Sequence, residues 1–332
     1  MSALAARTAS LVTQDHHQAP RPAHTTPPAL PREYRGHRIS VVIPALNEAV
    51  NIPEVLGRIP EWVHEVILVD GHSTDGTPDV ARLVWPNQHI VTRERRAGRE
   101  RRGGARLIAQ ERRGDGMILR LALQSRRGKG NALQAGLAAC TGAIVILLDA
   151  DGSTPPEEIA RFADTLIDGA DFAKGSRFLR GAGTDDMPLH RQIGNWGLVV
   201  AANVLFGTRY TDITYGYNAL WREHADTLAN EIDGWANEII SNIRIARHGL
   251  RVVEVPSFEQ PRLAGEAKLQ GVFRIGWRIL RAIIVERCRP CPPRKAPDGL
   301  LGQDDVIDIT RADSSQHLPI VHERPERLEV SA

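Results

Sequence analysis

Cysteine is scarce in this sequence of 332 residues, which contains only Cys140, Cys288 and Cys291. Three cysteines exclude a disulfide framework and favour a reducing, cytoplasmic setting. Cys288-Arg-Pro-Cys291 is a single C-x-x-C without a second pair. It is interpreted either as a zinc or redox site or as two free thiols in a tail.

Long apolar runs and a strong net charge are lacking as well. No stretch approaches the length of a membrane span, and the first residues lack the apolar core of a signal peptide. The net charge is only +2, which argues against nucleic-acid binding by the molecule as a whole. We therefore expect a cytoplasmic protein, with peripheral contact at the inner face of the cell membrane left open.

Both ends of the chain lack sustained hydrophobic periodicity. Residues 1–36 are rich in Ala, Thr, His, Gln and Pro, and residues 290–332 begin with a Pro-rich, basic stretch and continue as a polar tail. We expect both segments to be disordered. The folded unit is then a single domain over residues 37–289, which is long enough to bury a sizeable core.

An uninterrupted apolar run, Ala143 to Leu148, ends abruptly in Asp149-Ala150-Asp151-Gly152. Such a run is typical of a strand buried on both faces, and ligands of open α/β sheets bind at the carboxyl ends of the strands. Residues i and i+2 of a strand point to the same side, so two hard oxygen ligands would face one Mg²⁺ or Mn²⁺. The alternative is an acidic turn without a ligand.

Other apolar runs alternate with helical patterns, which indicates an α/β fold with a mostly parallel sheet. Strands are expected at 38–44 and 66–70, and helices at 51–59 and from Gly128 to about Gly142. Gly128-Lys129-Gly130 does not have P-loop spacing, so a nucleotide triphosphatase is not expected.

Several motifs in this order resemble family 2 glycosyltransferases, and later ones resemble the dolichyl- or polyprenyl-phosphate mannose synthase branch. The motifs are Val42 to Glu48, Val69 to Thr77, Gly128-Lys129-Gly130, Asp149 to Gly152, Gly175 to Phe178 and Arg262 to Leu269. The resemblance covers about residues 39–285. It implies a GT-A fold, a Rossmann-like three-layer domain that binds a nucleotide sugar and inverts the anomeric carbon in one displacement.

The resemblance also implies roles for individual residues. Those around the donor nucleotide are Pro44, Asn47, Glu48, Asp70, Asp75, Lys129 and Asp149. A divalent metal, Mg²⁺ or Mn²⁺, would be held by Asp149 and Asp151, and the expected catalytic residues are Asp151, Arg177 and Glu238. For Asn47 and Asp75 a turn or cap role stays open, and for Arg177 that of a surface cation.

Two departures from the family pattern concern an Arg-rich stretch and the residues before Glu238. Residues 93–125 are interpreted as an insertion outside the motif framework, so a protein lacking about residues 93–124 is expected to fold. In Asp233-Gly234-Trp235-Ala236-Asn237-Glu238, only Glu238 stays in phase with the acids of the relatives. Glu238 would orient the acceptor, whereas Asp233 is interpreted as a cap of the following helix.

The acceptor side is expected in the later part of the chain. Residues 187–206 become an apolar helix, and Tyr215 and Tyr217 would either stack on sugar or lipid or belong to the core. Residues 269–289 form an amphipathic, basic pattern, which suits packing on the domain or contact with an anionic membrane. Arg262 and Lys268 would bind an acceptor phosphate.

The sequence thus predicts an inverting hexosyltransferase, with mannose from GDP-mannose as the expected donor sugar and a polyprenyl phosphate as acceptor. Three alternatives stay open: a UDP-sugar-dependent transferase with another acceptor, a sugar nucleotidyltransferase, and a non-catalytic nucleotide-sugar binder. The nucleotidyltransferase would be expected to carry a Gly-rich basic loop after the first strand, where this chain has Pro44 to Glu48. No nucleic-acid partner is expected.

Overall fold

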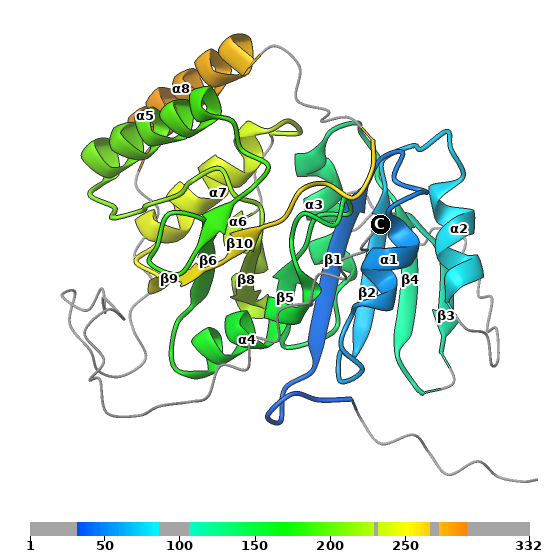
Figure 1. Cartoon of the computed structure of the whole chain (residues 1–332). Coiled ribbons are helices and arrows are strands. Elements are labelled where there is room, and N and C mark those ends of the chain that lie inside the picture. The colour runs from blue at the N-terminus through cyan, green and yellow to red at the C-terminus, as the bar shows by residue number, and fades with distance from the viewer. Residues whose placement is uncertain (1–31, 86–105, 114, 229–231, 266–271, 291–332) are drawn as a thin grey trace, which may run out of the picture. The chain divides into compact units, whose positions relative to one another are not determined.

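The computed structural model describes residues 32–85, 106–113, 115–228, 232–265 and 272–290. An eight-stranded sheet in the order β3-β4-β2-β1-β5-β8-β6-β9 lies at its centre (Figure 1). Its strands are β1 (Ile39–Ala45), β2 (Glu65–Asp70), β3 (Arg106–Arg112), β4 (Ile118–Leu123), β5 (Ile144–Leu147), β6 (Phe172–Ser176), β8 (Asn218–Trp221) and β9 (Val252–Pro256). Two short strands, β7 (Gly183–Thr184) and β10 (Phe258–Glu259), form a separate parallel pair.

Most strands of the sheet are parallel to their neighbours. β4, β2, β1 and β5 run the same way, and β6 is parallel to β9, whereas β8 is antiparallel to β5 and β6 and β3 is antiparallel to β4. Parallel strands place their carboxyl ends along one edge, so the loops after β1, β2 and β5 meet there. The mostly parallel sheet expected from the sequence is confirmed.

Helices cover both faces of the sheet, which gives the three layers. The helices are α1 (Ile52–Gly57), α2 (Thr77–Val84), α3 (Lys129–Ala139), α4 (Ile159–Ile167), α5 (Leu189–Phe206), α6 (Ala225–Leu228), α7 (Ala236–Arg247) and α8 (Val272–Cys288), with 3₁₀ turns η1 (Pro156–Glu158) and η2 (Arg222–His224). Side chains of β1 alternate between the layers: Val41 and Ile43 pack toward α1 and α4, and Val42 packs toward α3. This alternation explains why the strand is apolar throughout.

The segment interpreted as an insertion contributes two strands to this sheet. β4 pairs with β2 along its whole length, and β3 pairs with β4 as the edge strand. Met117, Leu119 and Leu121 are buried in the same core as β1 and β2. The expectation that about residues 93–124 can be removed is therefore wrong, because removal would take two strands and their core side chains. β4 also supplies the strand before Gly128 that the sequence did not reveal.

The folded unit begins slightly before the expected boundary. Tyr34 and His37 exchange backbone hydrogen bonds, and the Tyr34 hydroxyl donates to Asp164 over 3.1 Å. Residues 32–36 are thus ordered, contrary to the expectation of disorder. Residues 1–31 and 291–332, and with them the rest of both predicted tails, lie outside the described residues.

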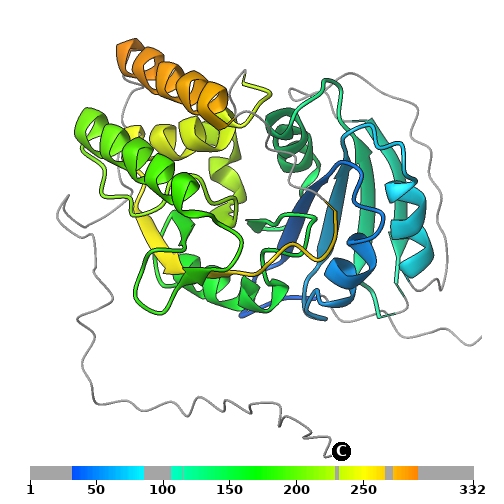
Figure 2. The same cartoon turned by 45° about the horizontal axis from the view of Figure 1, so that its top comes forward.

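Helices α5 and α8 pack against each other and against α7 on the side of the domain away from β3 (Figures 1 and 2). Both occur where the sequence predicted helices. Within the described ranges, no helix is both long and apolar enough to cross a membrane. Tyr215 and Tyr217, by contrast, are almost fully buried, so the core interpretation of these two aromatics is confirmed.

Candidate active site

The two acids of the Asp-Ala-Asp-Gly motif lie just beyond the carboxyl end of β5. The backbone N–H of Asp149 donates to the Thr154 hydroxyl over 3.1 Å. One oxygen of Asp151 accepts bonds from the Ser153 N–H and hydroxyl over 3.0 and 2.7 Å. These bonds fix a tight turn after the strand. The alternation of side chains along a strand therefore does not apply to the two acids, although both line the same cleft.

Lys129 and Glu238 complete a charged cluster around Asp149. Lys129, the first residue of α3, lies 2.7 Å from Asp149 Oδ1 and 3.0 Å from Glu238 Oε1. Burial raises the pKa of Asp149 to about 6, and the nearby carboxylates of Asp151 and Glu238 act in the same direction, opposed by Lys129. Burial alone would lower the pKa of Lys129, but the two carboxylates beside it outweigh burial and raise it. The lysine therefore stays charged.

Arg262 closes the cluster from the loop before α8. Its guanidinium lies 2.7 Å from Asp151 Oδ2 and 3.0 Å from Glu48 Oε1. Glu48 in turn accepts a bond from the Asn51 amide over 2.6 Å. The other predicted acceptor cation, Lys268, lies outside the described residues.

The remaining predicted donor residues shape two adjoining loops. The Asn47 side chain accepts a bond from the Thr74 N–H over 2.8 Å. The backbone of Asn47 has a positive φ of 51°. Asp75 accepts bonds from the backbone N–H groups of Ala49 and Thr77 over 2.9 and 3.0 Å. Asp70 accepts bonds from the N–H groups that follow it, His72 and Ser73. Asn47 and Asp75 therefore hold the loops after β1 and β2 together, which agrees with a turn role for both, whereas Asp70 braces only the loop after β2.

Arg177 follows β6 and is almost fully buried. Its guanidinium contacts Asp212 over 2.7 and 3.0 Å and Glu259 over 3.0 and 3.1 Å, and donates to the Thr214 hydroxyl over 2.9 Å. The alternative of a surface cation is thereby ruled out. Because two carboxylates already neutralise this charge, Arg177 fixes the cleft wall rather than presenting a free cation.

A large cleft of about 960 Å³ joins these groups to the apolar helices α5 and α8. Of the predicted residues, those that line it are Pro44, Glu48, Lys129, Asp149, Asp151, Arg177, Glu238 and Arg262. Its far wall is formed by side chains of α5, including Ile193 and Leu198, and of α8, including Trp277 and Leu280. A ligand with a charged and an apolar part would fit this division of the walls.

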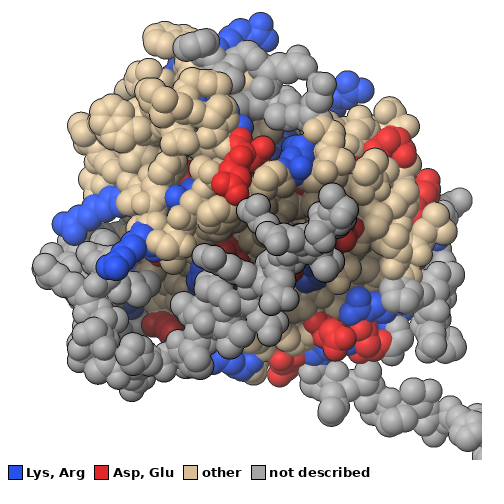
Figure 3. All heavy atoms as spheres, in the orientation of Figure 1, with Lys and Arg blue, Asp and Glu red and all other residues tan. Residues whose placement is uncertain are grey.

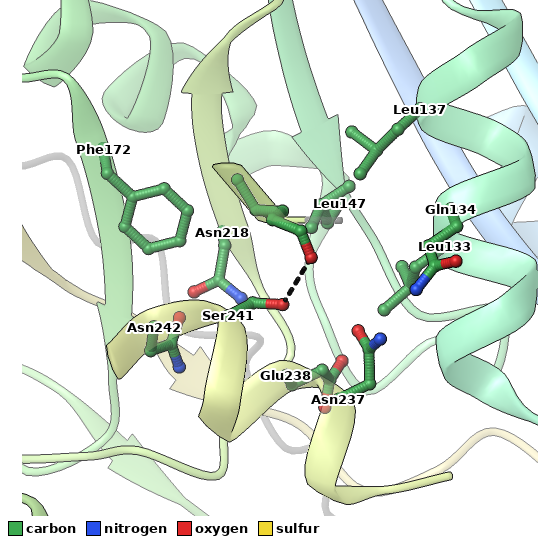
Figure 4. Close-up of a pocket in the computed structure, with 11 residues that line it drawn as sticks. Leu133, Gln134, Leu137, Leu147, Phe172, Asn218, Asn237, Glu238, Ser241 and Asn242 are labelled. Carbon is green, nitrogen blue, oxygen red and sulfur yellow. Dashed lines mark hydrogen bonds between the residues drawn. The ribbon is translucent and has the colours of Figure 1, made fainter. Parts of the chain in front are cut away.

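A second cavity of about 10 Å³ is lined by Glu238 and by side chains of α3, β5, β6, β8 and α7 (Figure 4). The Ser241 hydroxyl at its wall donates to the carbonyl oxygen of Leu228 over 3.2 Å. The side-chain oxygen of Asn218 is buried at the same wall and, among the described residues, has no hydrogen-bond partner. A space of this size is about that of a single water molecule, and Glu238 lines both this mostly apolar cavity and the main cleft.

Sequence reasoning missed several residues of the cleft. Gly216, which precedes β8, lies so close to the cluster that an added Cβ would be 3.0 Å from Asp149, Lys129 and Glu238 alike. Trp235 lines the cleft beside Lys129. No motif spacing marks either residue, because both come near Lys129 only through the fold. Asp233, expected to cap α7, instead pairs with Arg126 over 2.9 Å.

The two acids have the chemistry of a divalent metal site. Both offer hard carboxylate oxygens, and Mg²⁺ commonly takes one or two carboxylates from the protein and the rest of its ligands from water and substrate phosphates. The fold and the cleft together define a GT-A domain, an α/β domain with its ligand site at the carboxyl edge of the sheet.

Comparisons with known proteins agree with this class. The family model described as glycosyl transferase family 2 matches residues 40–112 and 103–228. An undecaprenyl-phosphate mannosyltransferase from Micrococcus luteus is 32% identical over 245 residues, which cover 70% of this chain and 88% of the relative. A polyprenol monophosphomannose synthase from Mycolicibacterium smegmatis is 31% identical, covering 70% of this chain and 82% of the relative.

Solved structures show the same fold. A glucosyl-3-phosphoglycerate synthase from Mycobacterium tuberculosis, in complex with Mg²⁺ and uridine diphosphate, superimposes with a TM-score of 0.55 at 24% identity, covering 76% of this chain and 80% of that one. The chain belongs to glycosyl transferase family 2. It is accordingly a glycosyltransferase that uses a nucleotide sugar, as its motifs predicted.

Proposed function

We propose that this glycosyltransferase moves a hexose, with mannose from GDP-mannose as the expected donor, to a polyprenyl phosphate at the cytoplasmic face of a membrane. The observation that carries the proposal is the single cleft that runs from Asp149 and Asp151 to the apolar side chains of α5 and α8. Charged and apolar walls in one cleft suit an acceptor that is a phosphate attached to a hydrocarbon chain. The names of the mannosyltransferase relatives support the same acceptor class.

Asp149 and Asp151 would hold a Mg²⁺ or Mn²⁺ ion against the donor diphosphate. When bound, the ion would neutralise the charge that develops on the departing nucleoside diphosphate. Lys129 places a permanent positive charge beside Asp149 and so beside the donor diphosphate. Arg262, which pairs with Asp151 from the opposite loop, would bind the acceptor phosphate. The loops tied together by Asn47 and Asp75, with Asp70 bracing the second of them, would hold the nucleoside beside Pro44 and Glu48.

In the transfer, an oxygen of the acceptor phosphate forms a bond to the anomeric carbon, while the bond from that carbon to the donor phosphate oxygen breaks. The nucleoside diphosphate leaves with the electron pair, and the anomeric configuration inverts. A phosphate is already an anionic nucleophile at neutral pH, so it requires positioning rather than a general base. Glu238 is engaged by Lys129, which suits a role in orientation.

The test combines labelled GDP-mannose, UDP-glucose and other nucleotide sugars with polyprenyl phosphate and a divalent ion. We expect labelled lipid from one donor, no transfer in excess chelator, and recovery with Mg²⁺ or Mn²⁺. Asp151→Asn should abolish transfer without unfolding the protein. Asp226→Asn, which changes an exposed carboxylate on α6, should behave as the wild type. Full activity in excess chelator would refute the metal site.

Two variants distinguish a phosphate acceptor from a hydroxyl acceptor. With a phosphate acceptor, Arg262→Ala should impair transfer far more than donor hydrolysis, and Glu238→Gln should reduce transfer only modestly because no base is required. Arg209→Ala, at an exposed arginine beyond α5, serves as the matched control. An inactive Glu238→Gln enzyme beside a fully active Arg262→Ala enzyme would move the assignment to a hydroxyl acceptor.

We further propose that the outer surface of α5 and α8 contacts an anionic membrane. The α5 residues Trp196 and Val204 are 68% and 78% exposed, and Ile284 and Val285 of α8 are also well exposed. The face of the domain seen in Figure 3 carries few charged side chains over α5. Exposed arginines of α8, at 274, 278 and 281, add positive charge to the same helix. Apolar side chains with flanking arginines are typical of interfacial helices.

Co-sedimentation with vesicles tests this membrane contact. The wild type should bind vesicles that contain phosphatidylglycerol, and binding should weaken with added salt because the attraction is partly electrostatic. Val204→Glu should reduce binding, whereas Leu83→Glu, at an exposed apolar residue of α2, should not. Equal binding by both variants would exclude α5 as the contact surface.

A further inference from the structure

The loop that carries Trp235 is bonded to the start of α3 on its N-terminal side. The Gly130 N–H donates to the Asp233 carbonyl over 2.9 Å, and the Asn237 amide donates to the Ile232 carbonyl over 2.8 Å. A Cβ at Gly130 would be 2.2 Å from the Ile232 carbonyl oxygen, so the loop before α7 packs directly on the start of α3. The backbone next to Trp235 is therefore fixed on α3, and its side chain lines the cleft.

The indole of Trp235 stands next to the metal-binding acids. Its ring centroid is 5.6 Å from the Lys129 ammonium, which itself lies 2.7 Å from Asp149. The side chain lines the cleft and remains 39% exposed, so part of its surface is open to a ligand. A large aromatic side chain left open at this place is available for contact rather than for the core.

The part of the donor that can reach Trp235 is the sugar. The loops after β1 and β2, which would hold the nucleoside, lie on the side of β5 that faces β3. Trp235 instead precedes α7 and lies next to Lys129 at the other end of the site. With the diphosphate at Asp149 and Asp151, the hexose extends beyond the diphosphate, away from the nucleoside. Lys129 and Glu238 then border the space next to the indole.

A pyranose ring combines hydroxyl groups at its rim with a face of C–H groups. The electron-rich face of an indole attracts such weakly positive hydrogens, while charged side chains bond the hydroxyls. We propose that Trp235 is the stacking surface for the transferring hexose, an assignment that rests on the proposed function. It is thus a specificity-determining residue, because epimers present different C–H faces to a fixed indole.

Calorimetry on the full chain with Mn²⁺ tests the assignment by comparing a nucleoside diphosphate with its sugar. Two pairs of ligands are measured on the wild type first: GDP with GDP-mannose, and UDP with UDP-glucose. The pair that binds the wild type is then used for the variants. Trp235→Leu should weaken the sugar nucleotide about tenfold while the nucleoside diphosphate binds as before. Trp235→Phe, which keeps an aromatic face, should retain most of the affinity. Trp196→Leu, at an exposed tryptophan of α5 that does not line the cleft, should change neither affinity.

Each contrary result has a distinct meaning. Unchanged sugar-nucleotide affinity in Trp235→Leu, or an equal loss for both ligands, would overturn the stacking role while the proposed function stands. The same selective loss in Trp196→Leu would overturn it as well, because that indole lies outside the cleft. A wild type that binds none of these nucleotides would overturn the stacking role and the proposed function together.

Discussion

Replacing Arg177 by methionine should destabilise the protein strongly. The guanidinium makes four contacts of 2.7 to 3.1 Å with Asp212 and Glu259, and the side chain of Asp212 is 0% exposed. Methionine fills much of the volume but leaves both carboxylates without their cation. Breaking a buried ion pair by removing one partner typically costs about 3–5 kcal/mol, because an uncompensated charge remains. We expect a loss of this size in the free energy of unfolding.

The pH dependence of this loss identifies its cause. Burial would raise the pKa of Asp212, but Arg177 outweighs burial and holds that pKa below its ordinary value. In the wild type this contribution to stability is present above about pH 4 and is lost as the pH falls through the lowered pKa. Without Arg177 the folded-state pKa should instead rise, so the variant loses stability as the pH increases. The difference between the two proteins should therefore narrow from pH 7 toward pH 4.

Urea unfolding at several pH values measures this difference, and Arg177→Met with Asp212→Asn should recover part of the stability. Transfer activity is followed on the same samples at low temperature, where each protein is folded. A variant that keeps wild-type stability at pH 7 but has no activity would refute the reasoning. Arg177 would then contact substrate, as the sequence expected, rather than position the wall through Asp212 and Glu259.

The remaining predictions concern the sheet and the cluster around Asp149. A variant lacking residues 106–123 should fail to fold, as seen by circular dichroism, because β3 and β4 and the buried Met117, Leu119 and Leu121 are removed; a soluble, cooperatively melting product would contradict this. Gly216→Ala should lower transfer about tenfold or more with little change in melting temperature, because its Cβ would press on Asp149 and Lys129, which are proposed to hold the donor. Normal transfer by Gly216→Ala would show that the cluster tolerates the shift.

The sequence predicted the central strands well because their signal is local. β1, β2 and β5 are buried on both faces, and such strands appear as unbroken apolar runs. β3 carries charged residues, with Arg106 and Arg112 exposed at its ends, because it lies at the edge of the sheet. β4 carries Arg120 within its apolar run, and this arginine pairs with the buried Glu65 of β2 over 2.8 Å. A partner 55 positions away cannot be recognised from the local pattern, so both strands were taken for an insertion.

The same distinction between local and long-range information applies to the predicted site residues. Asp149, Asp151 and Lys129 could be placed from sequence because each follows directly from a strand end or a helix start. Asp75 belongs to an equally well-marked motif, yet its two oxygens accept bonds from backbone N–H groups of two loops. Burial and these hydrogen bonds act in opposite directions on the pKa of Asp75, and the bonds prevail and lower it. A motif therefore locates the carboxylates near a site. Only the folded structure shows which carboxylates line the ligand cleft and which ones hold the surrounding loops in place.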